Sequence, residues 1–170
     1  MREKELCKIL NVDKDLIKCI VVNADGDCFY HCISQIVNVS IQELRNIVAS
    51  MFTDNIYEDY KATCQFSDEL IWIRRCKNVN EAKELLSIPK LVWADEFALS
   101  VIIQHFDLTL YIINEGNGRN SMNSLVKLGN GKTKIILNRT RREHYNLIHF
   151  NSNNEEQITN FYNQFVHQNI

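Results

Sequence analysis

The chain has 170 residues, of which 45% are hydrophobic and 24% are charged. This size and composition predict one folded domain over residues 1–170 and exclude an intrinsically disordered chain. The formal net charge of −2 gives no overall attraction to nucleic acid or to an anionic membrane, so we expect neither as a partner.

No targeting or membrane-spanning segment is expected. The first ten residues mix charged and apolar side chains, and no apolar run approaches the roughly 20 residues that a membrane span requires. We therefore expect a cytoplasmic protein, and we expect it to be a monomer.

Six cysteines are present, and a cytoplasmic protein keeps its cysteines reduced. No Cys-x-x-Cys pair occurs, and Cys28 and Cys32 have the spacing of a helix rather than that of zinc ligands. We therefore expect no metal and no other cofactor. Five of the cysteines are interpreted as small core residues and one as functional.

The first third of the chain predicts helices around one strand. A short helix is expected up to about residue 10, and the β-branched segment 17–23 favours an extended strand. Apolar residues repeat on one face from Cys28 onward, which indicates a helix that begins there. Ser40 and Glu43 have the spacing of a capping box, so a second helix should follow at once.

The middle of the chain has the least decisive pattern. Residues 54–90 contain helical patches, and Asn80 is a candidate cap for a helix over 81–86. An apolar stripe predicts a further helix that begins at Trp93.

The last third predicts a sheet and a terminal helix. Strand candidates lie at 108–114, 124–128, 133–138 and 144–150. The dipeptide at 130–131 is Asn-Gly, which favours a tight turn between the second and the third of these strands. An apolar repeat predicts a packed helix over 154–168. Helices followed by an antiparallel sheet give an α+β fold.

A cysteine follows a glycine-containing turn and opens a predicted helix. The free N–H groups of a helix N-terminus stabilise an anion, which lowers the pKa of a thiol such as that of Cys28. The backbone N–H groups of Asp25, Gly26, Asp27 and Cys28 can also point at a developing oxyanion. The carboxylates of Asp25 and Asp27 oppose this, unless they point elsewhere. A lone cysteine is more often a buried core residue, and from these residues alone that alternative stays open.

A base for this thiol is found near the C-terminus. In an extended strand, residues i and i+2 project from the same face, so Asn146 lies beside His144 and its amide oxygen can orient the imidazole. A neutral asparagine fixes the tautomer but stabilises the imidazolium less than a carboxylate does. Without Cys28 in view, His144 is equally well a histidine with no catalytic role on a half-exposed strand.

Three segments resemble one family. Residues 25–31 (DGDCFYH) resemble the nucleophile motif of the ovarian-tumour (OTU) deubiquitinases, in which an Asp-Gly-x-Cys turn opens the central helix and an aromatic residue follows. Residues 144–148 (HYNLI) resemble the histidine motif of that family, in which an aromatic residue and then Asp or Asn follow the base. Residues 93–100 (WADEFALS) are similar to its Trp-Gly-x-x-Glu helix start, although Ala94 replaces the glycine and the acidic residue is displaced.

The resemblance implies a papain-like OTU fold, with a small central β-sheet flanked by helices, that hydrolyses isopeptide bonds at the C-terminus of ubiquitin without a cofactor. It makes Cys28 the nucleophile, His144 the base and later the general acid, and Asn146 the orienting group. It places the oxyanion hole on the backbone of residues 25–28, with Asp25 structuring that turn. OTU domains as short as this one look like viral or bacterial ones, which would place the protein in a host cytoplasm, acting on host ubiquitin signalling.

The substrate and its surface follow from the same resemblance. Because ubiquitin ends in Gly-Gly, the channel must be narrow, and Tyr30, Trp93 and Tyr145 are candidates for its walls; Trp93 is equally well a core residue. Segments 54–88 and 114–124 are expected to contact the modifier. Two alternatives stay open: a protease for another ubiquitin-like modifier, and a ubiquitin-binding module without activity, which would have no need of Cys28 and His144.

Overall fold

The computed structural model describes residues 3–9, 12–13, 15–116, 123–140, 144–151 and 155–166. Along the chain its helices and strands are α1 (Glu3–Ile9), β1 (Ile17–Ile20), α2 (Cys28–Val37), α3 (Ile41–Met51), α4 (Asp54–Thr63), the 3-10 helix η1 (Asp68–Arg75), α5 (Val79–Ser87), α6 (Glu96–His105), β2 (Leu108–Asn114), β3 (Ser124–Leu128), β4 (Thr133–Arg139), β5 (Tyr145–Phe150) and α7 (Glu155–Val166). This mixture of helices and one sheet confirms the predicted α+β class.

The sheet has the strand order β1-β5-β4-β2-β3. Neighbouring strands are antiparallel except for β2 and β4, which are parallel. The expected tight turn between β3 and β4 is therefore wrong, because β2 lies between these two strands. The backbone N–H of Gly131 donates to the carbonyl of Leu108 and that of Thr133 to the carbonyl of Asp107, so the chain crosses the start of β2 instead of reversing on itself.

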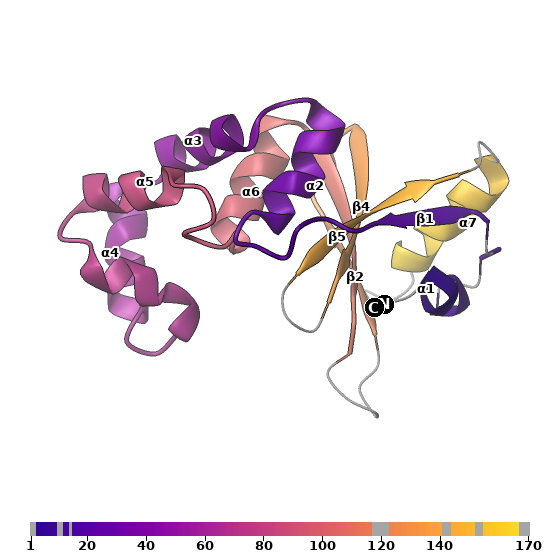
Figure 1. The fold of residues 1–170 in the computed structure, drawn as a ribbon, viewed down its shortest axis with the longest axis horizontal. Helices are drawn as coiled ribbons and strands as arrows, with labels where there is room; N and C mark the ends of the chain where they lie inside the picture. The colour runs from indigo at the N-terminus through magenta and orange to yellow at the C-terminus, as the bar shows by residue number, and fades with distance from the viewer. Residues whose placement is uncertain are drawn as a thin grey trace.

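Helices cover both faces of the sheet (Figure 1). Helices α2 and α6 lie on one face, and α1 and α7 lie on the other. The central strand β2 is buried on both sides: Leu110 and Ile112 face α2 and α6, and Tyr111 and Ile113 face α1 and α7. This double burial explains its continuous apolar sequence.

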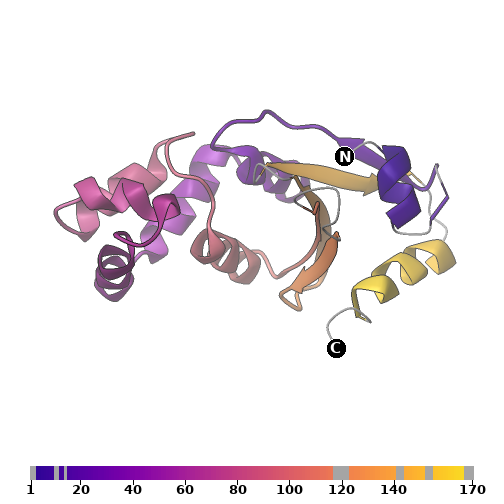
Figure 2. The same cartoon turned by 90° about the horizontal axis from the view of Figure 1, so that it is seen from below.

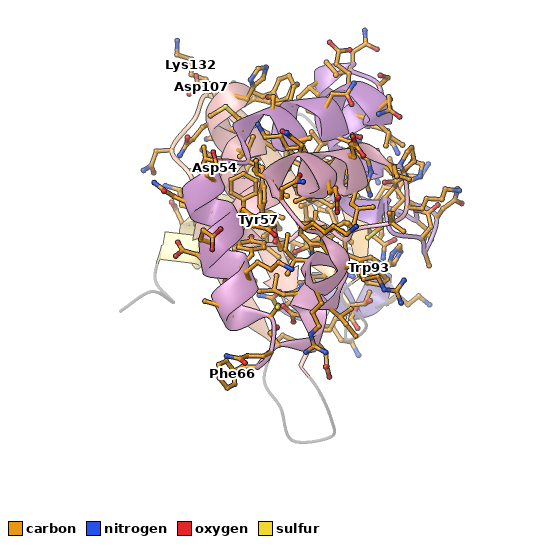
Figure 3. The ribbon with its side chains drawn as sticks, turned by 90° about the vertical axis from the view of Figure 1, so that its left-hand side faces the viewer. Asp54, Tyr57, Phe66, Trp93, Asp107 and Lys132 are labelled. Atoms are coloured by element: carbon orange, nitrogen blue, oxygen red, sulfur yellow. The ribbon has the colours of Figure 1, made fainter. Side chains whose placement is uncertain are left out.

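A helical lobe extends from one end of the sheet. Helices α3, α4, η1 and α5 pack around a third apolar cluster that contains Phe52, Ile73 and Val92. The lobe lies at the opposite end of the molecule from α1 and α7 (Figure 2). Seen from its outer side, Phe66 protrudes below α4, and it is 83% exposed (Figure 3).

Side-chain caps fix where α3, α4, α5 and α6 begin. The hydroxyl of Ser40 accepts the Glu43 N–H at 3.2 Å, as predicted. The predicted cap at Asn80 is wrong, because the side chain of Asn78 accepts the Glu81 N–H and starts α5 at Val79. The helix expected from Trp93 begins at Glu96 instead, because Asp95 caps it through the Ala98 N–H.

The C-terminal helix and the cysteines can be compared with their predictions in the same way. The terminal helix is confirmed over Glu155–Val166. All six cysteines are free, and the five expected in the core are buried except Cys19, which is partly buried. Within the part of the chain that the structure describes, no helix is long and apolar enough to cross a bilayer.

Candidate active site

The turn at residues 25–28, which we call the nucleophile turn, is held together by Asp25. Its backbone carbonyl accepts the Cys28 N–H at 3.2 Å, and its carboxylate accepts the Asp27 N–H at 3.0 Å. The predicted structuring role of Asp25 is thus visible in the hydrogen bonds. The Asp27 and Cys28 amides are occupied by these bonds, which leaves Asp25 and Gly26 as the amides of this turn that make no hydrogen bond to any described residue.

The turn is pressed against the backbone of the segment that follows α5. A Cβ atom at Gly26 would overlap the carbonyl of Lys90, so only glycine fits there. The ammonium group of Lys90 lies 3.3 Å from the carboxylate of Asp25, and His31 lies 3.7 Å from the other carboxylate oxygen. Burial alone would raise the pKa of Asp25, but the Asp27 N–H, Lys90 and His31 together lower it. Asp25 is therefore ionised at neutral pH.

Cys28 is the first residue of α2, and its side chain is buried. Burial raises the pKa of the Cys28 thiol, and the charge of Asp25 adds to this effect. The backbone N–H groups of Tyr145 and Phe29 act in the opposite direction but do not compensate. The expectation that the helix N-terminus lowers the thiol pKa is therefore wrong for this state, because desolvation of the sulfur outweighs the helix.

The predicted pair of His144 and Asn146 is in contact. Nε2 of His144 lies 3.1 Å from the side-chain oxygen of Asn146. The backbone N–H of Val22 donates to the same oxygen at 3.3 Å, which identifies that atom as the acceptor. Nε2 of the imidazole therefore carries the proton, and Nδ1 carries the lone pair. Nδ1 is buried and makes no hydrogen bond to any residue that the structure describes.

The start of β5 lies at Cys28. The backbone N–H of Tyr145, the residue that follows His144, acts to lower the pKa of the Cys28 thiol, and Cys28 and Tyr145 line the same small cavity. The thiol and the imidazole themselves make no hydrogen bond among the described residues. The histidine that could complete a catalytic pair thus directly precedes a residue at the cysteine, and its Nδ1 makes no hydrogen bond to a described residue.

A cavity of about 20 Å³ adjoins Cys28. This volume is about that of one water molecule. Two of the three predicted channel walls, Trp93 and Tyr145, line it. Its remaining lining residues are Gly26, Cys28, Phe29, Ala94 and Arg139.

The third predicted wall is wrong. Tyr30 is 1% exposed and packs against Phe29 and under the guanidinium of Arg45, 4.6 Å from the ring centroid. Its side chain fills the space between α2 and α3 and does not reach the cavity.

Arg139 is a cavity residue that the sequence pattern did not single out. It is the last residue of β4, it pairs with Tyr145 across the sheet, and its guanidinium lies 5.8 Å from that ring. An arginine at the end of a strand carries no local signal for a binding role, so only the strand pairing could have identified it.

A wide groove of about 1610 Å³ leads to the cavity and shares four of its lining residues, Trp93, Ala94, Arg139 and Tyr145. The groove runs between the lobe and the sheet. Among its described lining residues, six are acidic and only Arg139 is positively charged. The acidic residues are Asp59, Asp68, Glu69, Asp95, Glu96 and Asp107. Segment 54–88 contributes α4 and η1 to the groove, whereas residues 117–122 of the other expected contact segment lie outside the described residues.

Comparisons with known proteins extend these observations. No family model matches the sequence, and no curated protein sequence is similar to it. Among solved structures, the OTU deubiquitinase from Wolbachia pipientis wMel bound to ubiquitin is 14% identical with a TM-score of 0.58, covering 80% of this chain and 97% of that one. The OTUD1 OTU domain is 18% identical with a TM-score of 0.54, covering 78% of this chain and 85% of that one. The Hazara virus OTU bound to ubiquitin is 19% identical with a TM-score of 0.52, covering 81% and 84%. These similarities confirm the resemblance at the level of structure: the chain has the fold of an OTU domain.

Proposed function

We propose that this protein is a cysteine-type deubiquitinase that hydrolyses isopeptide bonds at the C-terminus of ubiquitin. The observation that carries the proposal is the imidazole of His144, which Asn146 orients while Nδ1 makes no hydrogen bond to a described residue, in the residue directly before Tyr145, which lines the cavity at Cys28. The OTU fold and the ubiquitin bound to two similar structures support it.

The residues suggest the following sequence of steps. Nδ1 of His144 accepts the thiol proton, and the Cys28 thiolate attacks the carbonyl carbon of the scissile bond. The oxyanion that forms accepts hydrogen bonds from the free amides of the nucleophile turn, at Asp25 and Gly26. The intermediate collapses, and the lysine amine leaves with the proton from His144. His144 then takes a proton from the water that attacks the thioester. The Cys28 thiolate leaves and takes this proton back from His144, and the released carboxylic acid loses its proton to solvent.

The raised pKa of Cys28 gives this mechanism a resting state. A buried neutral thiol is unreactive until a proton acceptor removes its proton, and the imidazole of His144 makes no hydrogen bond to the thiol in this structure. We infer that binding of substrate in the groove closes this gap and produces the thiolate–imidazolium pair.

The small cavity supports a substrate that ends in glycine. With Trp93 and Tyr145 as walls and room for about one water molecule, it excludes side chains next to the scissile bond. The Gly-Gly end of ubiquitin meets this requirement. The acidic groove that leads to the cavity favours basic side chains further along the tail of the substrate.

A reactive probe tests the proposal directly. Ubiquitin carrying a C-terminal electrophile should form a covalent adduct with the wild-type protein, seen as a mass shift, and not with Cys28→Ala. His144→Ala should react far more slowly. Cys32→Ala is the matched control, because Cys32 is a fully buried cysteine one turn further along α2 and should leave the adduct unchanged.

The two alternatives give different results in the same assay. A protease for another ubiquitin-like modifier would react with the probe made from that modifier and not with the ubiquitin probe. A binding module would give no adduct with either probe and would still bind ubiquitin in a titration. That result would contradict the proposed activity.

A further inference from the structure

A charged side chain lies in the core directly behind the nucleophile turn. Arg45, on α3, is 0% exposed, and its Nε and Nη2 atoms both lie 2.5 Å from the carboxylate of Asp27. Burying a guanidinium is costly unless every donor is satisfied. Each nitrogen of Arg45 has an acceptor, because three backbone carbonyls add to Asp27: Nη1 donates to Leu86 at 3.0 Å, and Nη2 donates to Gly26 at 3.1 Å and to Val92 at 2.9 Å.

These partners belong to the two sides of the cavity at Cys28. Gly26 lines the cavity from the nucleophile turn, and Val92 directly precedes Trp93, which lines it from the other side. One guanidinium therefore joins the segment that contains the nucleophile to the segment that carries a channel wall. An arginine suits this task because its planar fork can hold several acceptors in a fixed arrangement.

Arg45 also determines how the nucleophile turn is oriented. In a trans peptide the C=O and N–H groups point in opposite directions. Because the Gly26 carbonyl points at Arg45, the N–H of the same peptide, on Asp27, points away from it and donates to Asp25. This orientation keeps the Asp25 carboxylate in the turn.

The ion pair has an electrostatic consequence for the thiol. Asp27 precedes Cys28 in the chain, and an unpaired carboxylate there would oppose formation of a thiolate. Its charge is neutralised by Arg45 at 2.5 Å, whereas Asp25 is the carboxylate whose charge raises the pKa of Cys28.

We propose that Arg45 is a positioning residue of the active site: it fixes the nucleophile turn against the segment that carries Trp93, and it shields the Cys28 thiolate from the charge of Asp27. The inference rests on the proposed thiol chemistry at Cys28.

The test compares Arg45→Met and Asp27→Asn, with Arg74→Met as the matched control. Arg74 also binds a backbone carbonyl, that of Cys64, but lies on η1 outside the cavity lining. For each variant, the rate of Cys28 alkylation by iodoacetamide is measured against pH by peptide mass spectrometry, together with hydrolysis of a fluorogenic ubiquitin amide.

The two halves of the ion pair should shift the alkylation profile in opposite directions. Arg45→Met leaves the Asp27 charge uncompensated and moves the midpoint to higher pH, whereas Asp27→Asn leaves the Arg45 charge uncompensated and moves it to lower pH. The double variant should return toward the wild-type midpoint. Loss of stability alone does not produce shifts of opposite sign.

Arg45→Met should also lower kcat at least about tenfold relative to Arg74→Met, because the hydrogen bonds that join the turn to the segment of the wall are lost. Shifts in the same direction, no shift, or kcat within about twofold of the control would overturn the inference. If Arg45→Met does not fold, the nearly isosteric Asp27→Asn decides the outcome alone, by the downward shift of its midpoint. If the wild type hydrolyses no ubiquitin amide, the proposed function fails, and the alkylation profiles still decide the role of Arg45.

Discussion

The side-chain oxygen of Asn146 lies 3.1 Å from Nε2 of His144, and no carboxylate takes this place. A neutral amide holds the ring in one tautomer but adds no negative charge to stabilise the imidazolium. The same oxygen is anchored by the Val22 N–H, so the orientation of the amide is set by the backbone of the segment that leads to the nucleophile turn.

Removing this amide should affect turnover more than binding. Asn146→Ala should lower kcat by about 10- to 100-fold with little change in KM, because the imidazole loses its orienting partner. Asn146→Asp keeps the acceptor and should recover most of the lost rate. Steady-state kinetics on a fluorogenic ubiquitin amide give both constants, and an alanine variant as fast as the wild type would contradict the role of Asn146.

The thiol of Cys28 should be slow to react in the absence of substrate. Burial raises its pKa above the ordinary value of 9.0, so the neutral thiol is favoured and the thiolate forms only as the pH rises through this higher value. The alkylation midpoint of Cys28 in the folded protein should therefore lie above that of the same cysteine in denaturant. A folded midpoint equal to or below the denatured one would show that the sulfur is not desolvated.

Trp93 should control which residue can precede the scissile bond. It is 49% exposed, so Trp93→Ala should affect stability little and should open the cavity. We expect the ratio of kcat/KM for substrates ending in Gly-Gly and in Gly-Ala to fall by about tenfold. Phe66→Ala is the control, since Phe66 is an exposed aromatic residue of the lobe outside the lining of both pockets, and its ratio should match the wild type.

The acidic lining of the groove should select for charge. Asp59→Asn combined with Asp68→Asn should weaken hydrolysis of peptide amides that carry lysines before Gly-Gly, and should leave those with glutamates unchanged or improved. High salt should reduce the wild-type preference in the same way, because the carboxylates are exposed. Glu58→Gln, an exposed change on α4 outside the groove, is the matched control. If the double variant keeps the wild-type preference, the charges of the groove do not determine substrate specificity.

The sequence predicted those features that depend on neighbouring residues. The start of α2 at Cys28 and the cap at Ser40 follow from short motifs, and β2 and β3 have their predicted bounds. The contact of Asn146 with His144 follows from strand geometry alone.

Features that depend on the packing of distant segments could not be predicted in this way. The Asn-Gly dipeptide at 130–131 predicts a hairpin turn, yet the parallel pairing of β2 and β4 decides the strand order. Tyr30 could not be assigned to the core from the sequence, because α2 is buried by the sheet on one side and by α3 on another. The buried surface of α2 is therefore wider than a single apolar stripe. Arg45 looks like a surface residue of an amphipathic helix until its four partners from three segments are seen together.

The outermost pairing of the sheet joins the two segments that carry the proposed nucleophile and base. Ile17 of β1 pairs with Phe150 of β5. Strand β1 leads to Cys28 and β5 follows His144, so β1 joins the sheet through its pairing with β5. Pairing segments so far apart in the chain requires closing a loop that spans most of its length, which costs conformational entropy. During synthesis Cys28 is made long before His144, so in the proposed mechanism a partly made chain carries the nucleophile without its base.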